Sequence, residues 1–310
     1  MGSCTEFHNR PFSKKVSSGW IFQIIYLKIL FLSSFIPGFL TKFQNKSIFI
    51  TGGASGIGLL MAKMIIEKSA SRLVILDINK EAMRKLELQW QNVETEVIFL
   101  EVNLSDDIQI QKVVDELDDQ NIEIDILINN AGVVTGKKFS EHTLTDIDIN
   151  MQVNALAPMK LTRLLLPGMI QRKSGHIVNI SSAASMLSNP GMSVYCASKW
   201  AMTGWSDSLR LEMERGNTGI KVLTVTPYYI DTGMFEGVKS PIIPILKPEK
   251  VTGKIIKAIE NNKMLLRTPG IVYVLPFLQG VLPKRIFDVV IGKYFGIYDS
   301  MNKFKGRIND

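Results

Sequence analysis

Tyr195 and Lys199 form the pair of residues whose types and spacing best suit proton transfer. They lie four positions apart in the stretch YCASK. On a helix, this spacing places two side chains one turn apart on the same face, where they can converge on one point. The same spacing also occurs on many solvated helices, so the pair alone does not establish a catalytic site. The choice between a catalytic pair and a coincidence on a solvated helix therefore depends on which helices and strands the rest of the sequence predicts around the pair.

A glycine-rich turn near residue 52 predicts a phosphate-binding site. The segment Lys46–Asn79 contains a buried strand, the turn TGGASGIG, an amphipathic helix and a second buried strand. Together these form one βαβ unit. Glycines in such a turn let a pyrophosphate approach the N-terminus of the helix, where N–H groups and the helix dipole favour anions. A plain tight turn is the alternative interpretation.

Asp77 ends the second strand of this unit, about 25 residues after the first glycine of the turn. A carboxylate at this position can accept hydrogen bonds from both ribose hydroxyls of an adenosine, and it would repel a 2′-phosphate. No basic residue stands at Gly53 or Ile78 to attract that phosphate. We therefore expect NAD as the cofactor in preference to NADP. Alone, Asp77 could equally be a turn residue at the end of a strand.

The rest of the chain continues the alternation of strands and helices. Near-continuous apolar runs are separated by segments of helical periodicity such as DDIQIQKVVDELDD, and the runs are EVIFLEV, IDILINNAG, GHIVNISS and IKVLTVTP. This pattern predicts an α/β fold, a Rossmann-type doubly wound parallel sheet with helices on both faces. Ligands of such folds bind beyond the carboxyl ends of the strands, which is where the polar clusters of this sequence fall.

The composition of the chain allows one substantial core. It has 310 residues, of which 46% are hydrophobic and 21% charged, and no long Ser/Gly linker divides it. We predict a tail with a membrane anchor at 1–44, a Rossmann domain at 45–262 and an apolar C-terminal extension at 263–310. The net charge of +7 is scattered and no nucleic-acid-binding motif accompanies it, so a membrane surface is the expected partner and nucleic acid is not. The two cysteines show neither a disulfide framework nor metal-ligand spacing.

The segment Trp20–Leu40 is long and apolar enough to act as a hydrophobic anchor helix. Lys28 lies inside it, which weakens the interpretation as a central membrane span. No small-residue cleavage site follows, which argues against a signal peptide. We therefore predict a retained anchor, either spanning or interfacial, on a membrane-associated protein whose catalytic domain is cytoplasmic. A buried core helix is the alternative.

The motifs from about residue 45 to 235 resemble those of the short-chain dehydrogenase/reductase family. They are TGGASGIG, NNAG at 129–132, the asparagine of MQVNALAP, the serine of NISSAAS and YCASK. The resemblance implies a catalytic tetrad of Asn154, Ser182, Tyr195 and Lys199. Ser182 is preferred to Ser181 because the family's serine lies thirteen residues before its tyrosine.

Each member of the tetrad has a role that the resemblance implies. Tyr195 would be the general acid/base, with its pKa lowered from about 10 by the Lys199 ammonium and the oxidised nicotinamide. Lys199 would also hold the nicotinamide ribose, Ser182 would hydrogen-bond the substrate oxygen, and Asn154 would hold a water for proton relay. The residues expected to contact the cofactor are Gly52, Ser55, Gly56, Ile57, Gly58, Asp77, Asn103, Asn130, Ala131, Gly132, Tyr195, Lys199, Pro227, Ile230 and Thr232.

Two positions depart from the family pattern. Asn103 stands where the family usually has an aspartate for the adenine, so that contact requires the amide oxygen as acceptor. Tyr228 follows Pro227 where the family usually has glycine, and it would reshape the nicotinamide or substrate wall.

The apolar loop MFEGVKSPIIPILKP, which is punctuated by prolines, and the apolar segment 271–298, which is interspersed with basic residues, together predict a substrate lid and an amphipathic tail that contacts a membrane. Ordinary core and dimer packing is the alternative. With the anchor and Asp77, this segment resembles the membrane-associated retinol dehydrogenase and 17β-hydroxysteroid dehydrogenase type 11 subgroup. The expected function is oxidation of a hydrophobic alcohol such as a retinoid, steroid or long-chain lipid. The alternatives are an NADPH-dependent lipid ketone reductase resembling 3-ketosphinganine reductases, and a non-catalytic dinucleotide-binding membrane scaffold. Segments 143–171 and 193–215 are long and helical, and in the family such segments pair across a two-fold axis, so the resemblance implies a homodimer or tetramer.

Overall fold

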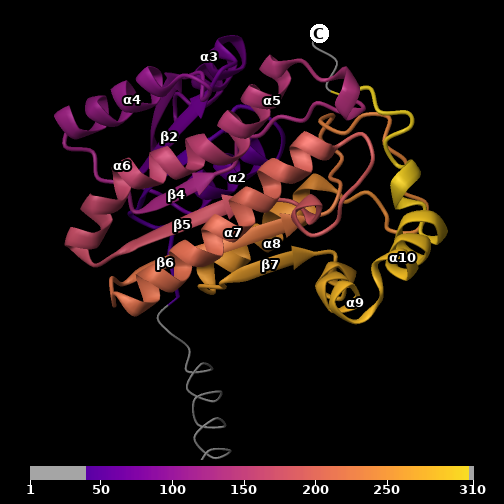
Figure 1. The fold of residues 1–310 in the computed structure, drawn as a ribbon. Coiled ribbons are helices and arrows are strands. Elements are labelled where there is room, and N and C mark those ends of the chain that lie inside the picture. Colours follow the sequence, from indigo (N-terminus) through magenta and orange to yellow (C-terminus); the bar gives the residue numbers. More distant parts are fainter. Residues whose placement is uncertain (1–39, 307–310) are drawn as a thin grey trace, which may run out of the picture. The chain divides into compact units, whose positions relative to one another are not determined.

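The computed structural model describes residues 40–306, whose strands form one seven-stranded parallel sheet (Figure 1). The strand order is β3-β2-β1-β4-β5-β6-β7, so the direction of winding reverses between β1 and β4. The strands are β1 (Ser47–Thr51), β2 (Arg72–Asp77), β3 (Glu96–Glu101), β4 (Ile126–Asn129), β5 (Gly175–Ile180), β6 (Ile220–Pro227) and β7 (Leu265–Thr268). The predicted Rossmann-type parallel sheet is confirmed.

Helices cover both faces of this sheet. One face packs against α2 (Gly56–Glu67), α3 (Lys80–Gln89) and α8 (Pro248–Glu260), and the other against α4 (Asp107–Asp119), α6 (Ala157–Arg172) and α7 (Ser193–Arg215). Successive strand residues point to opposite faces, so Ile48 and Ile50 of β1 join the α2 and α8 side while Phe49 joins the other. Because both faces are buried, the strands are apolar at nearly every position.

A π-helical turn, Gln152–Leu156, separates α5 (Leu144–Met151) from α6. Such turns are rare and are found most often at functional sites. Asn154 lies in the middle of this one and is fully buried. The turn joins the predicted segment 143–171 into one nearly continuous helical stretch, which with α7 supplies the helices expected to pair in a homodimer or tetramer. That assembly stays a prediction.

A chain of buried polar side chains crosses the sheet beneath α7. Asn129 Nδ2 donates to Asn179 Oδ1 at 2.8 Å, and Asn179 Nδ2 donates to Ser206 Oγ at 2.8 Å. Ser206 Oγ in turn lies 2.7 Å from Thr224 Oγ1. These bonds link β4, β5 and β6 to one another and to α7. Because buried polar groups need their partners, the network fixes how α7 sits on the sheet.

The C-terminal part of the chain adds to the sheet before it leaves it. Strand β7 lies after residue 262, where we predicted the Rossmann domain to end, and it pairs with β6. The sheet therefore extends into the predicted C-terminal extension. The chain then forms η4 (Gly270–Tyr273), α9 (Leu275–Val281), α10 (Lys284–Phe287), the π-helical turn η5 (Asp288–Tyr294) and η6 (Ile297–Asp299). In Figure 1 the arrowhead of β7 points toward the segment that carries α9 and α10.

Nearly all of the predicted anchor, Trp20–Leu40, falls outside the described residues. Between residues 40 and 306, no helix has both the length and the apolar character needed to cross a bilayer.

His176 predicts an acid-sensitive stability. It lies on β5 with 2% of its surface exposed, and neither ring nitrogen has a hydrogen-bond partner among the described residues. Burial, followed by the nearby charge of Lys221, lowers the pKa of His176 from 6.5 to about 4. Between these two pH values the unfolded chain binds a proton that the folded protein does not, so the free energy of unfolding falls as the pH falls.

We expect replacement of His176 by Leu or Gln to remove this contribution, which is about 3 kcal/mol at full extent. Urea unfolding at about pH 7 and about pH 4.5 measures it as the difference between the wild-type and variant pH dependence. Using both variants separates the loss of titration from a gain in apolar packing. Both substitutions remove the titrating imidazole, but only Leu adds an apolar side chain. An unchanged pH dependence in both variants would contradict the assignment.

Candidate functional site

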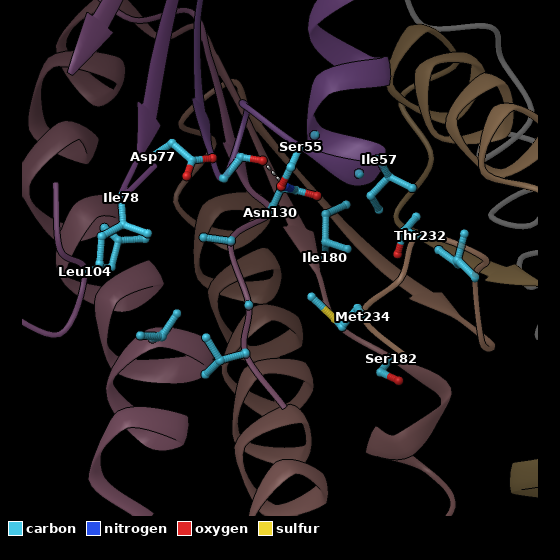
Figure 2. A pocket seen from close by; sticks show the side chains of 18 of the residues that line it. Ser55, Ile57, Asp77, Ile78, Leu104, Asn130, Ile180, Ser182, Thr232 and Met234 are labelled. Atoms are coloured by element: carbon cyan, nitrogen blue, oxygen red, sulfur yellow. Dashed lines mark hydrogen bonds between the residues drawn. The ribbon is translucent and has the colours of Figure 1, made fainter. Parts of the chain in front are cut away.

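A groove of about 400 Å³ lies beyond the carboxyl ends of the strands. Figure 2 shows Asp77, Ile78 and Leu104 at one end of it, with Met234 and Ser182 at the other. All of the residues that we predicted to contact a cofactor line this groove, and so does Ser182, whereas Asn154 does not. The topology thus brings the predicted residues together from β1, β2, β4, β5, β6 and α7.

The turn after β1 is held against the NNAG segment after β4. Thr51 Oγ1 accepts hydrogen bonds from the backbone N–H groups of Asn130 and Ala131, both at 3.0 Å. The side chain of Asn130 donates to the carbonyl oxygens of Thr51 at 2.9 Å and Gly52 at 3.1 Å. These hydrogen bonds join the turn after β1 and the NNAG segment after β4 into one surface, the floor of the groove.

Glycines are required where this floor is most crowded. Gly52 has φ +64°, and a Cβ added to it would lie 2.9 Å from Ala131 Cα. A Cβ on Gly58 would lie 2.0 Å from the carbonyl oxygen of Gly52. The first turn of α2 therefore packs directly onto the loop, and only glycine leaves room for that approach.

Asp77 is held in place at the end of β2. Its Oδ2 accepts a hydrogen bond from Ala54 N at 3.0 Å, and its Oδ1 accepts one from Asn79 N at 3.0 Å. The carboxylate is thereby fixed at the rim of the groove with acceptor capacity remaining, as a ribose-binding group requires.

The hydrogen bonds made by the side chain of Asn103 differ from our expectation. Its Oδ1 accepts hydrogen bonds from both the N–H of Ser105 at 3.0 Å and the hydroxyl of Ser105 at 2.7 Å. Both lone pairs of the amide oxygen are thus engaged, and the NH₂ group is what Asn103 can offer to a ligand. The predicted acceptor role toward an adenine is therefore not supported by this geometry.

The two candidate serines have separate tasks. Ser181 is buried, and its hydroxyl donates to the carbonyl of Lys199 at 3.1 Å and lies 2.7 Å from Thr203 Oγ1, which ties β5 to α7. Ser182 lines the groove, and its hydroxyl hydrogen-bonds the side chain of Tyr195. The geometry therefore places Ser182, rather than Ser181, beside the tyrosine.

Lys199 is almost fully buried, with 3% of its surface exposed. Its Nζ donates to the carbonyl oxygen of Ile180 at 3.0 Å and lies 5.8 Å from the centre of the Tyr195 ring. Burial lowers the pKa of Lys199 from 10.5 to about 8. The spacing of four positions between Tyr195 and Lys199 thus brings two buried side chains together at the groove.

The pKa of Tyr195 departs from our expectation. Burial raises it well above its usual value of 10, and the hydrogen bond from Ser182 only partly opposes that rise. Desolvation therefore outweighs the effect that we predicted for the lysine ammonium. In the protein alone, Tyr195 is a neutral phenol that is able to donate a proton.

Asn154 supports the site from behind. Its Oδ1 accepts from Val133 N at 2.8 Å, while its Nδ2 donates to Val133 O at 2.9 Å and Ser198 Oγ at 3.0 Å. A Cβ on Gly132 would lie 3.2 Å from Asn154 Oδ1 and 3.5 Å from Lys199 Nζ, so these groups meet at one point. Both amide hydrogens of Asn154 are used within the protein, and its predicted water relay stays a prediction.

Aromatic residues that the sequence did not assign form one wall of the site. Phe235 packs edge-on against Tyr195, with the ring centres 5.9 Å apart, and against Tyr229 at 5.0 Å. Tyr228, which stands at the position of the family glycine, is buried, and its hydroxyl lies 2.9 Å from Ser240 Oγ. This bond ties the end of β6 to the loop that follows Phe235. The sequence signals for this wall were the departure at Tyr228 and the apolar loop that contains Phe235.

Comparison with known proteins identifies the family of this chain. The family model described as short chain dehydrogenase matches residues 46–242. Human epidermal retinol dehydrogenase 2 is 36% identical over 262 residues, covering 83% of this chain and 84% of the relative. Rat estradiol 17-beta-dehydrogenase 11 is 28% identical, covering 92% of this chain and 95% of the relative. The solved short-chain dehydrogenase from Sphingobium yanoikuyae, in complex with NADPH, superposes with a TM-score of 0.68 at 24% identity, covering 77% and 97% of the two chains.

The chain therefore belongs to the short-chain dehydrogenase family and to its retinol dehydrogenase subgroup. It is a nicotinamide-dependent oxidoreductase that acts on CH–OH groups. The groove fits such a cofactor on its own geometry, since the N-terminus of α2 at Gly56, Ile57 and Gly58 lines it, where a pyrophosphate can bind, and Asp77 lies at its rim.

We expect Gly58→Ala to lower the affinity for the nicotinamide cofactor by about ten-fold or more, because the added methyl pushes α2 away from the loop. The quenching of protein fluorescence by NADH measures the affinity. Gly253→Ala on α8 is the matched control, since nothing lies within 4 Å of a Cβ added there. Equal affinities in the two variants, with native circular dichroism, would contradict this account of the floor.

Proposed function

We propose that this protein is an NAD-dependent dehydrogenase of a hydrophobic alcohol, of the retinoid, steroid or long-chain lipid class. The observation that carries the proposal is the convergence of Ser182, Tyr195 and Lys199 on a groove whose far wall is aromatic. The printed names of the relatives, a retinol dehydrogenase and an estradiol dehydrogenase, support this substrate class.

The chemistry follows from the positions of these three side chains. A bound nicotinamide supplies the group that accepts or gives the hydride. Ser182 donates a hydrogen bond to the substrate oxygen. In oxidation, Tyr195 first releases its own proton to solvent, and its phenolate oxygen then takes the proton of the substrate hydroxyl. In reduction, the neutral phenol gives its proton to the substrate oxygen. The positive charge of Lys199 lies close to Tyr195. It stabilises the phenolate form of Tyr195 once the tyrosine has lost its proton.

Reduction of a lipid ketone is the second candidate. The raised pKa of Tyr195 favours it, because a neutral phenol is the form that protonates a carbonyl oxygen. Asp77 argues against the NADPH form of this reaction, since its carboxylate would repel the 2′-phosphate. A non-catalytic dinucleotide-binding scaffold would have no need for the Ser182–Tyr195 hydrogen bond.

We expect Tyr195→Phe to lower turnover by about 10²–10⁴-fold, because it removes the group that transfers the proton. Oxidation and reduction are both followed by NADH absorbance, with a panel of retinol, steroid and long-chain alcohols and their carbonyl forms. Tyr273→Phe is the matched control, since its hydroxyl bonds only backbone groups near β7 and lies outside the groove. Full activity in Tyr195→Phe would refute the enzymatic proposal.

We expect the wild-type protein to prefer NAD over NADP, and Asp77→Ala to reduce that preference by about ten-fold or more, because the repulsive carboxylate is gone. The ratio of kcat/KM values for the two cofactors is the measurement. Glu101→Ala removes a carboxylate from the adjacent position of β3 without touching the groove and should leave the ratio unchanged. A wild-type protein that uses NADP equally well would contradict the assignment of Asp77.

We also propose that α9, α10 and η5 contact a membrane surface. Their buried side chains Leu275, Phe287 and Ile291 join the apolar cluster that contains Tyr195. Their outward side chains include several large apolar residues, namely Phe277, Val281, Ile286, Val289 and Tyr294, which are 51–80% exposed. The basic residues Lys284, Arg285 and Lys293 are exposed on the same elements. Apolar and basic side chains on one exposed segment suit an anionic lipid surface.

A protein truncated by residues 1–39 lacks nearly all of the predicted anchor, so its binding to membranes tests the proposed surface alone. We expect it to sediment with phosphatidylserine-containing vesicles, and the pair of changes Phe277→Ser and Val281→Ser to reduce the bound fraction by about half or more. Ile108→Ser on α4 is the control, because Ile108 is 80% exposed on a different element. Equal loss in the control, or no binding by the parent, would contradict the proposed surface.

A further inference from the structure

A second, smaller cavity adjoins the groove at its catalytic end. The two share Ser182, Tyr228 and Phe235 as lining residues. The second cavity has a volume of about 30 Å³, which is room for about one water-sized group. Most of its wall is apolar, with Leu187 and Ile297 among the lining residues. It therefore begins where the substrate oxygen would bind and leads away from the cofactor.

One polar cluster stands in this apolar wall, formed by Asn189, Tyr229 and Ser300. Asn189 Nδ2 donates to Tyr229 Oη at 3.0 Å and to Ser300 Oγ at 2.8 Å. Tyr229 Oη and Ser300 Oγ lie 3.1 Å apart. The three residues come from separate parts of the chain, and each is more than nine-tenths buried. These bonds hold the side chain of Asn189 at the edge of the cavity.

The amide oxygen of Asn189 takes no part in the hydrogen bonds of this cluster. It is buried, and it has no hydrogen-bond partner among the described residues. An unpaired buried acceptor is costly, so such an atom beside a cavity calls for a donor from outside the protein. In this arrangement both amide hydrogens are given to Tyr229 and Ser300, so the oxygen is the group of Asn189 that remains to bind a donor.

We propose that this second cavity is the inner end of the substrate site, where Asn189 Oδ1 accepts a hydrogen bond from a second hydroxyl group of the substrate. The proposal rests on the proposed alcohol dehydrogenase function and narrows its substrate class. A ketone or ether oxygen at the same place has no hydrogen to donate. An ammonium group is disfavoured because none of the described residues lining the cavity is a carboxylate.

The size of the cavity limits where this second hydroxyl lies. Ser182 and Asn189 line the same small space, so the reacting carbon and the second hydroxyl are separated by a short carbon chain. The apolar remainder of the substrate then lies in the larger groove, against Met234 and Phe235. The substrate class is thus a hydrophobic alcohol with a further hydroxyl a few carbons from the reacting one.

The test uses pairs of ligands that differ only in the donor. Straight-chain diols of about three to about eight carbons are compared with their mono-methyl ethers. Binding is measured by the shift in thermal unfolding of Tyr195→Phe in the presence of NAD, so no turnover interferes. At one or two chain lengths we expect the diol to bind about ten-fold more tightly than its ether or better.

Replacing the acceptor gives the matched comparison. Asn189→Leu in the same background should bring the ratio of the two affinities to about one, whereas Leu187→Met, which changes an apolar residue of the same cavity, should leave it unchanged. If Asn189→Leu does not fold, Asn189→Met replaces it, since it also lacks an acceptor oxygen at that position.

Two results would overturn the proposal. Equal affinity of diol and ether at every chain length would mean that the cavity holds only water. A preference for the diol that survives the Asn189 substitution would place the acceptor elsewhere. A wild-type protein that oxidises none of the alcohols would refute the proposed function instead, while the ratio of affinities still decides the role of Asn189.

Discussion

The burial of Lys199 is the constraint on which the site depends. An ammonium group removed from water is costly, and its pKa falls to about 8 because of that burial. The carbonyl of Ile180, at the end of β5, receives the hydrogen bond that holds it. The end of β5, the start of α7 and the groove must therefore meet within a few ångströms. The polar network of Asn179, Ser206 and Thr224 supports that meeting, since it bonds the middle of α7 to β5 and β6 through Ser206.

The tetrad works as a set of contacts around this lysine. Asn154 holds the backbone of Val133 and the hydroxyl of Ser198, one residue before Lys199, so it positions the loop after β4 and α7 together. Gly132 leaves the space in which the side chains of Asn154 and Lys199 approach each other. A π-helical turn is the local geometry that lets Asn154 reach inward from a helix. The asparagine thus acts in this structure through its neighbours.

The sequence predicted the parts of this protein that depend on local pattern. Apolar runs identified six strands because strands buried on both faces have no other composition, and the glycine turn is required by backbone crowding at Gly58. Strand β7 was missed because it has only four residues, one of them Arg267, and carries no periodic signal. The raised pKa of Tyr195 could not be predicted because it depends on burial by Phe235 and other residues distant in sequence. For the same reason, no spacing rule could have paired Asn189 with Ser300, 111 positions away.

The C-terminal segment has two features that suit the proposed dehydrogenase of lipid substrates: it packs around Tyr195, and it exposes an apolar surface. Its inward residues Leu275, Phe287 and Ile291 belong to the apolar cluster that contains Tyr195, and Ser300 accepts a hydrogen bond from Asn189. The outward residues of the same short helices leave large apolar side chains exposed. Under the proposed function, one stretch of chain thus supplies both the packing around Tyr195 and the outer apolar surface, so a substrate dissolved in lipid would approach the site past this stretch. Both features lie beyond residue 242, where the match to the family model ends.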